Sequence, residues 1–346
     1  MIYHLASQEG SDTMNTYAAS WGPAAGSRMQ ILLYKDLWEM KQLKRGSYIF
    51  SDLERLSPPE LRLAQRVWET ISDTEPRIRL LNNPSRVLCR YPLLRKLFEE
   101  GKNRFQAVRA TEPLHSLRFP VFVREENDHN GNLTPLIHSP ADLAWPLRSL
   151  TLRGYRLSDL LVVEFCDTSD RAGIFRKYSA FRIGNEILPR HVLFSRNWNL
   201  KRPDLVDPPF AKEKDDYLSQ NPHRAWLEEI FDFAGIEYGR IDYSMLGEVP
   251  QVWEINTNPM VRKLTPRLTS ALEAIDDSAP LEEAIPLAMD RTLVRAIRIE
   301  ERLQRRSRSY RAMADRLCSS QWARPFLWVA KTLLRPRYRT SRNPEY

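Results

Sequence analysis

The sequence predicts a mixed α/β protein, on three observations. Runs rich in β-branched and aromatic residues, such as residues 120–124 and 160–165, alternate with segments of helical periodicity. Helix-start signals are clear at Ser57-Pro58-Pro59-Glu60, where a capping serine precedes two prolines and a glutamate. The 346 residues are 42% hydrophobic and 10% aromatic, enough to bury a core in two domains or in one domain with several lobes. This alternation is typical of an α/β body.

The remaining elements follow from local patterns. After the serine cap, apolar residues recur at helical spacing, and a second helix over residues 91–100 ends at Gly101. A hairpin is predicted to turn at Gly184-Asn185, and a further pair of strands brackets Gly247. The segments concerned are strands at 178–183 and 186–194, a helix at 223–234, and strands at 240–244 and 251–255.

Composition divides the chain into four predicted segments. Residues 1–28 are rich in Ser, Ala and Gly without periodicity, so we expect a disordered extension; Met14 and Met29 are alternative starts. An N-terminal lobe is expected over 29–110, a nucleotide-binding part over 111–275 and a helical, basic extension over 276–346. Residues 291–346 hold 15 Lys+Arg and 4 Asp+Glu, a charge of +11 within a total of +8, so the rest of the chain is slightly acidic.

Several classes of protein are disfavoured. The three cysteines are far apart and form neither a disulfide framework nor a zinc spacing, which favours a cytoplasmic location. We find no signal-peptide pattern and no apolar stretch of membrane-spanning length. Because the basic charge is confined to the end of the chain, we expect no general nucleic-acid binding. That basic end could instead lie on an anionic membrane or polymer, or simply pack as a helix with a solvated face.

Hard-oxygen ligands for magnesium gather near Gly247. Glu254 and Asn256 are two residues apart on a predicted strand, so their side chains share a face. Asp242 lies on the preceding strand, and the turn would bring all three together. Two carboxylates and an amide oxygen suit Mg²⁺, with Mn²⁺ as the alternative ion. A surface hairpin with solvated acids is the competing interpretation, but the apolar neighbours Trp253 and Ile255 disfavour it.

The order Asp242, then Glu254-x-Asn256, then Pro259, resembles the last nucleotide-binding segment of the ATP-grasp superfamily. That superfamily includes D-alanine–D-alanine ligase, glutathione synthetase and amino-acid ligases. The resemblance covers roughly residues 80–262. It implies an ATP-grasp fold, in which two α+β lobes clasp ATP beside a short N-terminal α/β lobe. It also implies that these three residues hold Mg²⁺ on the phosphates of ATP.

The resemblance implies further nucleotide contacts upstream. Arg90 and Arg124 stand where relatives have phosphate-binding lysines, and the loop after Arg124 has one glycine where relatives have several. Glu164 is expected to contact the ribose or adenine, and backbone groups near Phe165 to read the base edge. Either Arg176 or Lys177 would supply a basic phosphate contact. A buried structural role remains the alternative for Glu164, as does a solvated surface role for either basic residue.

The resemblance also implies that Arg190 or Arg196 stabilises the charge that develops on the transferred phosphoryl group. His191 between them is a candidate base, although a lone histidine in a strand is more often structural. The implied activity is an ATP-dependent carboxylate–amine ligase acting through an acyl phosphate, on small carboxylate and amine substrates or a peptide. The alternatives are a phosphotransferase on a hydroxyl compound such as a sugar, and a non-catalytic nucleotide-binding protein.

Overall fold

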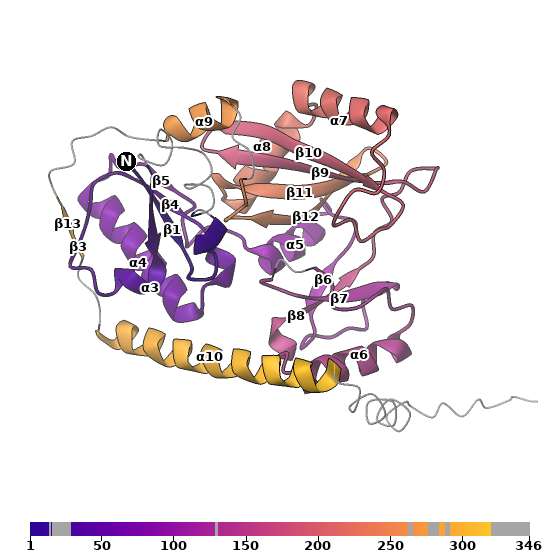
Figure 1. The fold of residues 1–346 in the computed structure, drawn as a ribbon, viewed down its shortest axis with the longest axis horizontal. Coiled ribbons are helices and arrows are strands. Elements are labelled where there is room, and N and C mark those ends of the chain that lie inside the picture. The colour runs from indigo at the N-terminus through magenta and orange to yellow at the C-terminus, as the bar shows by residue number, and fades with distance from the viewer. Residues whose placement is uncertain are drawn as a thin grey trace, which may run out of the picture. The chain divides into compact units, whose positions relative to one another are not determined.

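The computed structural model describes residues 1–13, 15, 29–128, 131–261, 266–275, 284–287 and 291–319. It confirms the mixed α/β class (Figure 1). The chain forms two compact units. The first comprises Met1–Gln106 and Cys166–Glu300, and the second comprises Ala107–Phe165 and Glu301–Tyr346. The predicted nucleotide-binding part, 111–275, is therefore divided between both units.

A parallel sheet forms the N-terminal part of the first unit. Its order is β2-β1-β4-β5, with β1 at Ile2–Ala6, β2 at Met29–Leu33, β4 at Ser47–Phe50 and β5 at Leu80–Leu81. The prediction that residues 1–28 are all disordered is wrong for β1, which lies between two strands and is buried along its length. Residues 14 and 16–28 lie outside the described part. The composition of residues 1–28 did not predict β1, because this strand is ordered by pairing with β2 and β4, which lie more than twenty residues away in the sequence.

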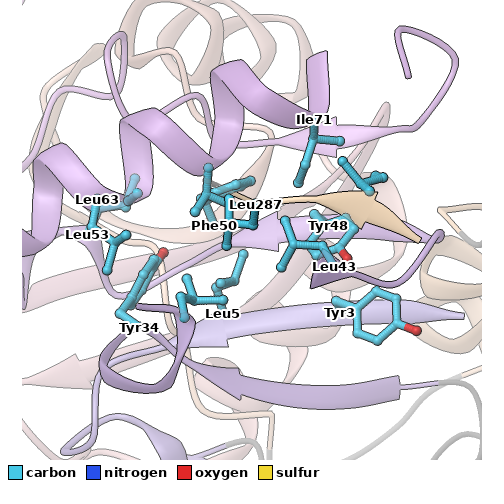
Figure 2. Close-up of a cluster of buried hydrophobic side chains, with 14 of the residues drawn as sticks. Tyr3, Leu5, Tyr34, Leu43, Tyr48, Phe50, Leu53, Leu63, Ile71 and Leu287 are labelled. Atoms are coloured by element: carbon cyan, nitrogen blue, oxygen red, sulfur yellow. The ribbon is translucent and has the colours of Figure 1, made fainter. Parts of the chain in front are cut away.

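Helix α4 (Pro58–Thr74) covers one face of this sheet. It begins at Ser57 with the predicted capping box, in which Glu60 accepts the Ser57 backbone N–H at 2.8 Å. Side chains from α4 and the strands form a core shown in Figure 2. Leu5, Phe50, Leu63 and Ile71 are fully buried there. Short elements complete this part: α3 (Tyr34–Leu37), η1 (Leu53–Arg55), and β3 (Gln42–Leu43) paired with β13 (Ile285–Pro286).

His4 lies fully buried in the central strand β1, and its Nε2 atom makes no hydrogen bond within the described residues. Burial lowers the pKa of His4 to about 3. Below its ordinary pKa, the unfolded chain therefore takes up a proton that the folded protein does not, and stability falls as the pH falls towards 3. His4→Leu removes this linkage. Between pH 7 and 4.5, we expect its unfolding free energy to drop about 2.5 kcal/mol less than that of the wild type.

Urea unfolding of both proteins at the two pH values measures this difference. Because Leu is apolar and close to His in size, little packing is lost in the fully buried site. An equal drop in both proteins would show that His4 is already protonated in the fold.

An antiparallel sheet forms the rest of the first unit. Its order is β10-β9-β11-β12, with β9 at Phe175–Ile183, β10 at Glu186–Ser195, β11 at Tyr238–Leu246 and β12 at Val249–Asn256. Both hairpins match the prediction, and Gly184 and Gly247 supply the positive φ that their turns require. Helices α5 (Arg90–Glu99) and α8 (Arg224–Ala234) pack on one face of this sheet. Leu93 of α5 and Phe231 of α8 share a core there with Ile241 of β11. The remaining helices are α7 (Pro208–Gln220) and α9 (Pro266–Glu273).

Asn82 joins the two sheets of the first unit. It has a positive φ of 64° after β5, and its side chain is fully buried. Its Oδ1 accepts the backbone N–H groups of Glu237 and Tyr238 at 2.8 and 2.9 Å. Its Nδ2 donates to the carbonyls of Phe50 and Tyr238 at 3.1 and 2.8 Å. All four bonds of one amide therefore connect β4 and β11, fixing the N-terminal lobe on the second sheet.

The second unit is built on a three-stranded antiparallel sheet. Its order is β6-β8-β7, with β6 at Ala107–Arg109, β7 at Val121–Glu125 and β8 at Leu160–Glu164. Helix α6 (Pro140–Leu152) packs on it through Leu143 and Leu150, and η2 (Leu157–Asp159) leads into β8. Within the range predicted as a helical extension, 276–346, the structure describes the strand β13 and the helix α10 (Arg291–Ser319); residues 276–283, 288–290 and 320–346 lie outside the described part. None of the described helices is long and apolar enough to cross a membrane.

Candidate functional site

Four polar side chains form one row across the antiparallel sheet. His191 of β10 pairs with Ser179 of β9, Ser179 pairs with Asp242 of β11, and Asp242 pairs with Glu254 of β12. Directly opposed residues of antiparallel strands point to the same face with Cβ atoms about 5 Å apart. The pairing therefore brings Asp242 and Glu254 together, as their spacing about Gly247 predicts. Asn256 follows on the same face, opposite Arg240.

Two irregularities in the strands shape this row. The register shifts beside Asp242, so that Trp253 is an extra residue between the pairs Asp242–Glu254 and Tyr243–Val252. This bulge lets Val252 and Ile255 both enter the core while Glu254 points away from it. A second shift in β10 makes Arg190 the extra residue before His191. Each bulge sets which side chains face the row, and neither is evident from alternation alone.

Asp242 is a buried carboxylate surrounded by cations. Its Oδ1 accepts the Ser179 hydroxyl at 2.9 Å and lies 3.2 Å from Arg240 Nε, and its Oδ2 lies 3.5 Å from Lys177 Nζ. Burial by itself would raise the pKa of Asp242, but Arg240 and Lys177 outweigh it and hold the pKa below its ordinary value. Asp242 is therefore charged at neutral pH, as a metal ligand needs to be.

Glu254 faces Arg90, the first residue of α5. The two side chains form an ion pair, and the Arg90 side chain is only 4% exposed. The structure thus places Arg90, predicted from the resemblance to bind phosphate, beside a predicted metal ligand. Asn256 is oriented by its own chain, because its Oδ1 accepts the Asn258 backbone N–H at 2.7 Å. An amide oxygen has two lone pairs, so the same atom would still have one for a cation if no residue outside the described part uses it.

Arg176 and Lys177 occupy opposite faces of β9, which distinguishes the two candidates that the sequence left open. Lys177 lies beside Asp242. Arg176 instead donates to Glu213 of α7 at 2.7 Å and to Asp170 at 2.6 Å. The structure therefore brings Lys177 to the row and does not bring Arg176 there.

Two further residues of the site were not predicted as site residues. Arg240 stands two residues before Asp242 on β11, a spacing that places both on one face and that could have identified it. Its Nε makes no hydrogen bond within the described residues. Ser179 holds the Asp242 carboxylate, and a lone serine in a strand gives no signal in the sequence.

The arginine candidates of the β10 region differ in position. Arg190, the bulged residue, acts on the charge of His191 together with Arg240 and Lys177. Arg196 lies beyond the end of β10, exposed, and donates to the Ala172 carbonyl at 3.4 Å. It is not brought to the row. Burial first, and then these three cations, lowers the pKa of His191 to about 4, although Asp242 opposes them. His191 is therefore neutral at physiological pH.

The donor set fits a magnesium ion bound together with phosphates. The described residues contain no group of three or more His, Cys, Asp or Glu that could hold a metal by themselves. Asp242, Glu254 and Asn256 supply three oxygens, so the octahedron of Mg²⁺ would need oxygens from phosphate or water. Arg90, Lys177 and Arg240 around them provide positive charge for such a polyanion. The residues present therefore fit a metal–phosphate pair better than a bare cation.

The other predicted nucleotide residues lie in the second unit. Arg124 is on β7, and its Nη2 lies 3.5 Å from the Asp128 carbonyl. Glu164 is buried at the end of β8. Its carboxylate accepts two hydrogen bonds from Arg118, one from Nη2 at 2.6 Å and one from the backbone N–H at 2.7 Å. The backbone N–H of Phe165 donates to the Pro120 carbonyl at 2.9 Å, so this one group is already used within the second unit. Arg118 was not predicted, and its pairing favours a structural role for Glu164.

No family model matches the sequence, and no curated protein matches it. Solved structures do match. One is a D-alanine–D-alanine ligase from Bacillus anthracis complexed with ATP, 13% identical over 80% of this chain and 95% of that chain, with a TM-score of 0.47. An L-amino acid ligase from Bacillus licheniformis is 10% identical over 74% of this chain and 66% of that chain, with a TM-score of 0.39. A RimK domain ATP-grasp protein from Sphaerobacter thermophilus is 12% identical over 80% of this chain and 99% of that chain, with a TM-score of 0.42. The solved structures similar to this chain thus include ATP-grasp proteins, the superfamily that its Asp242 and Glu254-x-Asn256 pattern resembles.

Proposed function

We propose that this chain is an ATP- and magnesium-dependent ligase that joins a carboxylate to an amine. The observation that carries the proposal is the row on the antiparallel sheet, in which Asp242 and Glu254 face each other among three cations. The two carboxylates would bind the metal ion, and the three cations would bind the phosphates. The row therefore offers groups for both parts of a metal–triphosphate complex. Arg124, Glu164 and Phe165 remain predictions for the nucleotide.

The reaction would proceed in two steps. A carboxylate oxygen of the substrate attacks the γ-phosphorus of ATP, the bond to the β-phosphate oxygen breaks, and ADP leaves an acyl phosphate. The amine nitrogen then attacks the acyl carbon, phosphate leaves with the bonding electron pair, and the amine releases a proton. When bound, Mg²⁺ draws negative charge from the phosphate oxygens.

The protein's own residues would act mainly by position and charge. Lys177 and Arg240 lie beside Asp242 and would stabilise the negative charge that is spread over the transferring group. Arg90 holds Glu254 in a fixed orientation from the start of α5. Ser179 does the same for Asp242. Pre-oriented groups need no rearrangement during the reaction, which is how such sites lower a barrier.

ADP and phosphate formation over a panel of amino acids and short peptides tests the proposal. A ligase forms both products only when a carboxylate and an amine substrate are present together. ADP formed with a sugar or another hydroxyl compound, and a phosphorylated product, would instead identify a phosphotransferase. Binding of Mg·ATP with no ADP under any condition would identify a non-catalytic nucleotide-binding protein.

The opposite faces of β9 give a paired prediction. Lys177→Met should weaken Mg·ATP binding about tenfold, because a charge-assisted contact to phosphate is lost. Arg176→Met should leave the affinity within about twofold, since Arg176 faces Glu213 and Asp170. Titration calorimetry with Mg·ATP measures both. Equal losses in the two variants would mean that Lys177 makes no special contact with the nucleotide.

A further inference from the structure

The exposed face of α10 combines apolar and basic side chains. Ile299, Leu303, Tyr310 and Met313 are each more than half exposed, at 51, 54, 51 and 53%. With Arg306, which is also exposed, they follow one another at steps of four, three, four and three residues, so they form one stripe along the helix. Arg295 and Arg302 are exposed on the same side, whereas the Arg298 guanidinium lies over the Trp38 ring, 5.4 Å from its centroid. We call the stripe together with Arg295 and Arg302, seven residues in all, the α10 face.

Other side chains of α10 make most of its contacts with the protein. Within the first unit, Ile297 is fully buried in the core of the N-terminal lobe. Within the second unit, Ala314 is buried, and Arg311 donates to the Gly154 carbonyl at 3.1 Å and pairs with Glu125 at 2.6 Å. Most of the α10 face is therefore left towards solvent, although the half-exposed Tyr310 ring also lies beside Gly154.

The charge of the α10 face has one sign. Three of its seven residues are arginines, and none is acidic. Residues 320–346 continue the same composition, with six Lys+Arg against one Asp+Glu and two tryptophans. An exposed apolar stripe that is flanked by arginine matches the interfacial helices that lie in the plane of a membrane surface.

We propose that the α10 face docks this protein on an anionic phospholipid surface. Leu303 and Met313, with the exposed part of the Tyr310 ring, enter the boundary between headgroups and acyl chains, and the arginines contact lipid phosphates. A second copy of the helix fits less well, because Arg306 lies within the stripe and would meet like charge in a helix pair. The inference does not depend on the proposed ligase activity.

Flotation of the full-length protein with vesicles tests this proposal. We expect flotation with phosphatidylcholine vesicles that contain phosphatidylglycerol, little flotation with phosphatidylcholine alone, and weaker binding at high salt. Each arginine near an anionic surface contributes about a fivefold factor in binding. Arg302→Ala with Arg306→Ala should therefore lower the partition coefficient about thirtyfold. Leu303→Ala with Met313→Ala should lower it at both salt concentrations.

A matched control is the pair Arg62→Ala and Arg66→Ala, which removes two exposed arginines from α4 instead. This variant should float as the wild type does. The proposal is overturned if the wild type does not float with anionic vesicles, or if the Arg302/Arg306 variant floats like the wild type. In the second case, binding that is lost on removing residues 320–346 would assign the contact to that segment. Binding to a single-stranded RNA but not to vesicles, or a dimer that the Leu303/Met313 variant dissociates, would overturn it as well.

Discussion

Asp242→Asn should lower ATP-dependent turnover about a thousandfold, the largest effect that we expect of any single change. The substitution keeps the size of the side chain and removes one of the two carboxylates that face each other on β11 and β12. Asparagine cannot supply the charge that a hard divalent cation requires. It also leaves Lys177 and Arg240 without the carboxylate that both approach. The rise in melting temperature caused by Mg·ATP should disappear as well, because ligand stabilisation follows affinity.

Asp232→Asn is a suitable control, since Asp232 is a surface carboxylate of α8 that pairs with Arg182. It should retain both turnover and the Mg·ATP-dependent rise in melting temperature. Circular dichroism of the Asp242 variant distinguishes loss of the site from loss of the fold. A folded Asp242→Asn protein that still shows the full rise would contradict the assignment of Asp242 to the metal. Glu254→Ala should abolish the rise in the same way.

Arg240→Met should reduce turnover about a hundredfold, while Mg·ATP binding weakens much less. Arg240 Nε lies 3.2 Å from Asp242 Oδ1 in an ion pair, but its N–H is not directed at a hydrogen-bond acceptor among the described residues. An N–H donor of this kind could form a hydrogen bond to the negative charge that develops in the transition state of phosphoryl transfer. Single-turnover kinetics separates the two effects, because it measures the chemical step apart from binding.

Arg182→Met provides the comparison for Arg240. Arg182 belongs to the same sheet but pairs with Asp232 and the Gly184 carbonyl at the hairpin end of β9. Its loss should affect stability and leave the chemical step unchanged. If both variants lose turnover equally, the effect of Arg240 is a general effect of charge on the sheet. A fall in binding as large as the fall in turnover would assign Arg240 to ATP affinity alone.

Local patterns predicted much of this site. The two-residue spacing of Glu254 and Asn256 and the turn at Gly247 place the three metal-ligand candidates correctly on one face, because strand alternation is a local property. The capping box at Ser57 and the start of α5 near Arg90 were predictable for the same reason. Alternation also requires Arg176 and Lys177 to face opposite sides. It cannot say which of them faces the acids, since that depends on the pairing of β9 with β11.

The features that the sequence did not reveal depend on distant parts of the chain. Strand β1 is ordered by its pairing with β2 and β4. Composition alone suggested disorder, because it does not reveal pairing with strands distant in the sequence. The bulges at Trp253 and Arg190 arise from the fit of neighbouring strands. The pairing of Glu164 with Arg118 joins residues 46 apart. In each case the deciding interaction is made by tertiary structure, which local propensity does not encode.

The hydrogen bonds of Asn82 have a consequence for how the chain reaches this structure. Its partners Glu237 and Tyr238 are 155 and 156 residues later in the sequence, and the whole second unit up to Phe165 lies between them. During synthesis, the N-terminal lobe therefore leaves the ribosome long before the strand that completes it. Closing such a long loop is entropically costly and slow. Until β11 is synthesised, the face of the β2-β1-β4-β5 sheet that packs on it stays exposed to solvent. We expect aggregation or chaperone binding chiefly at this stage.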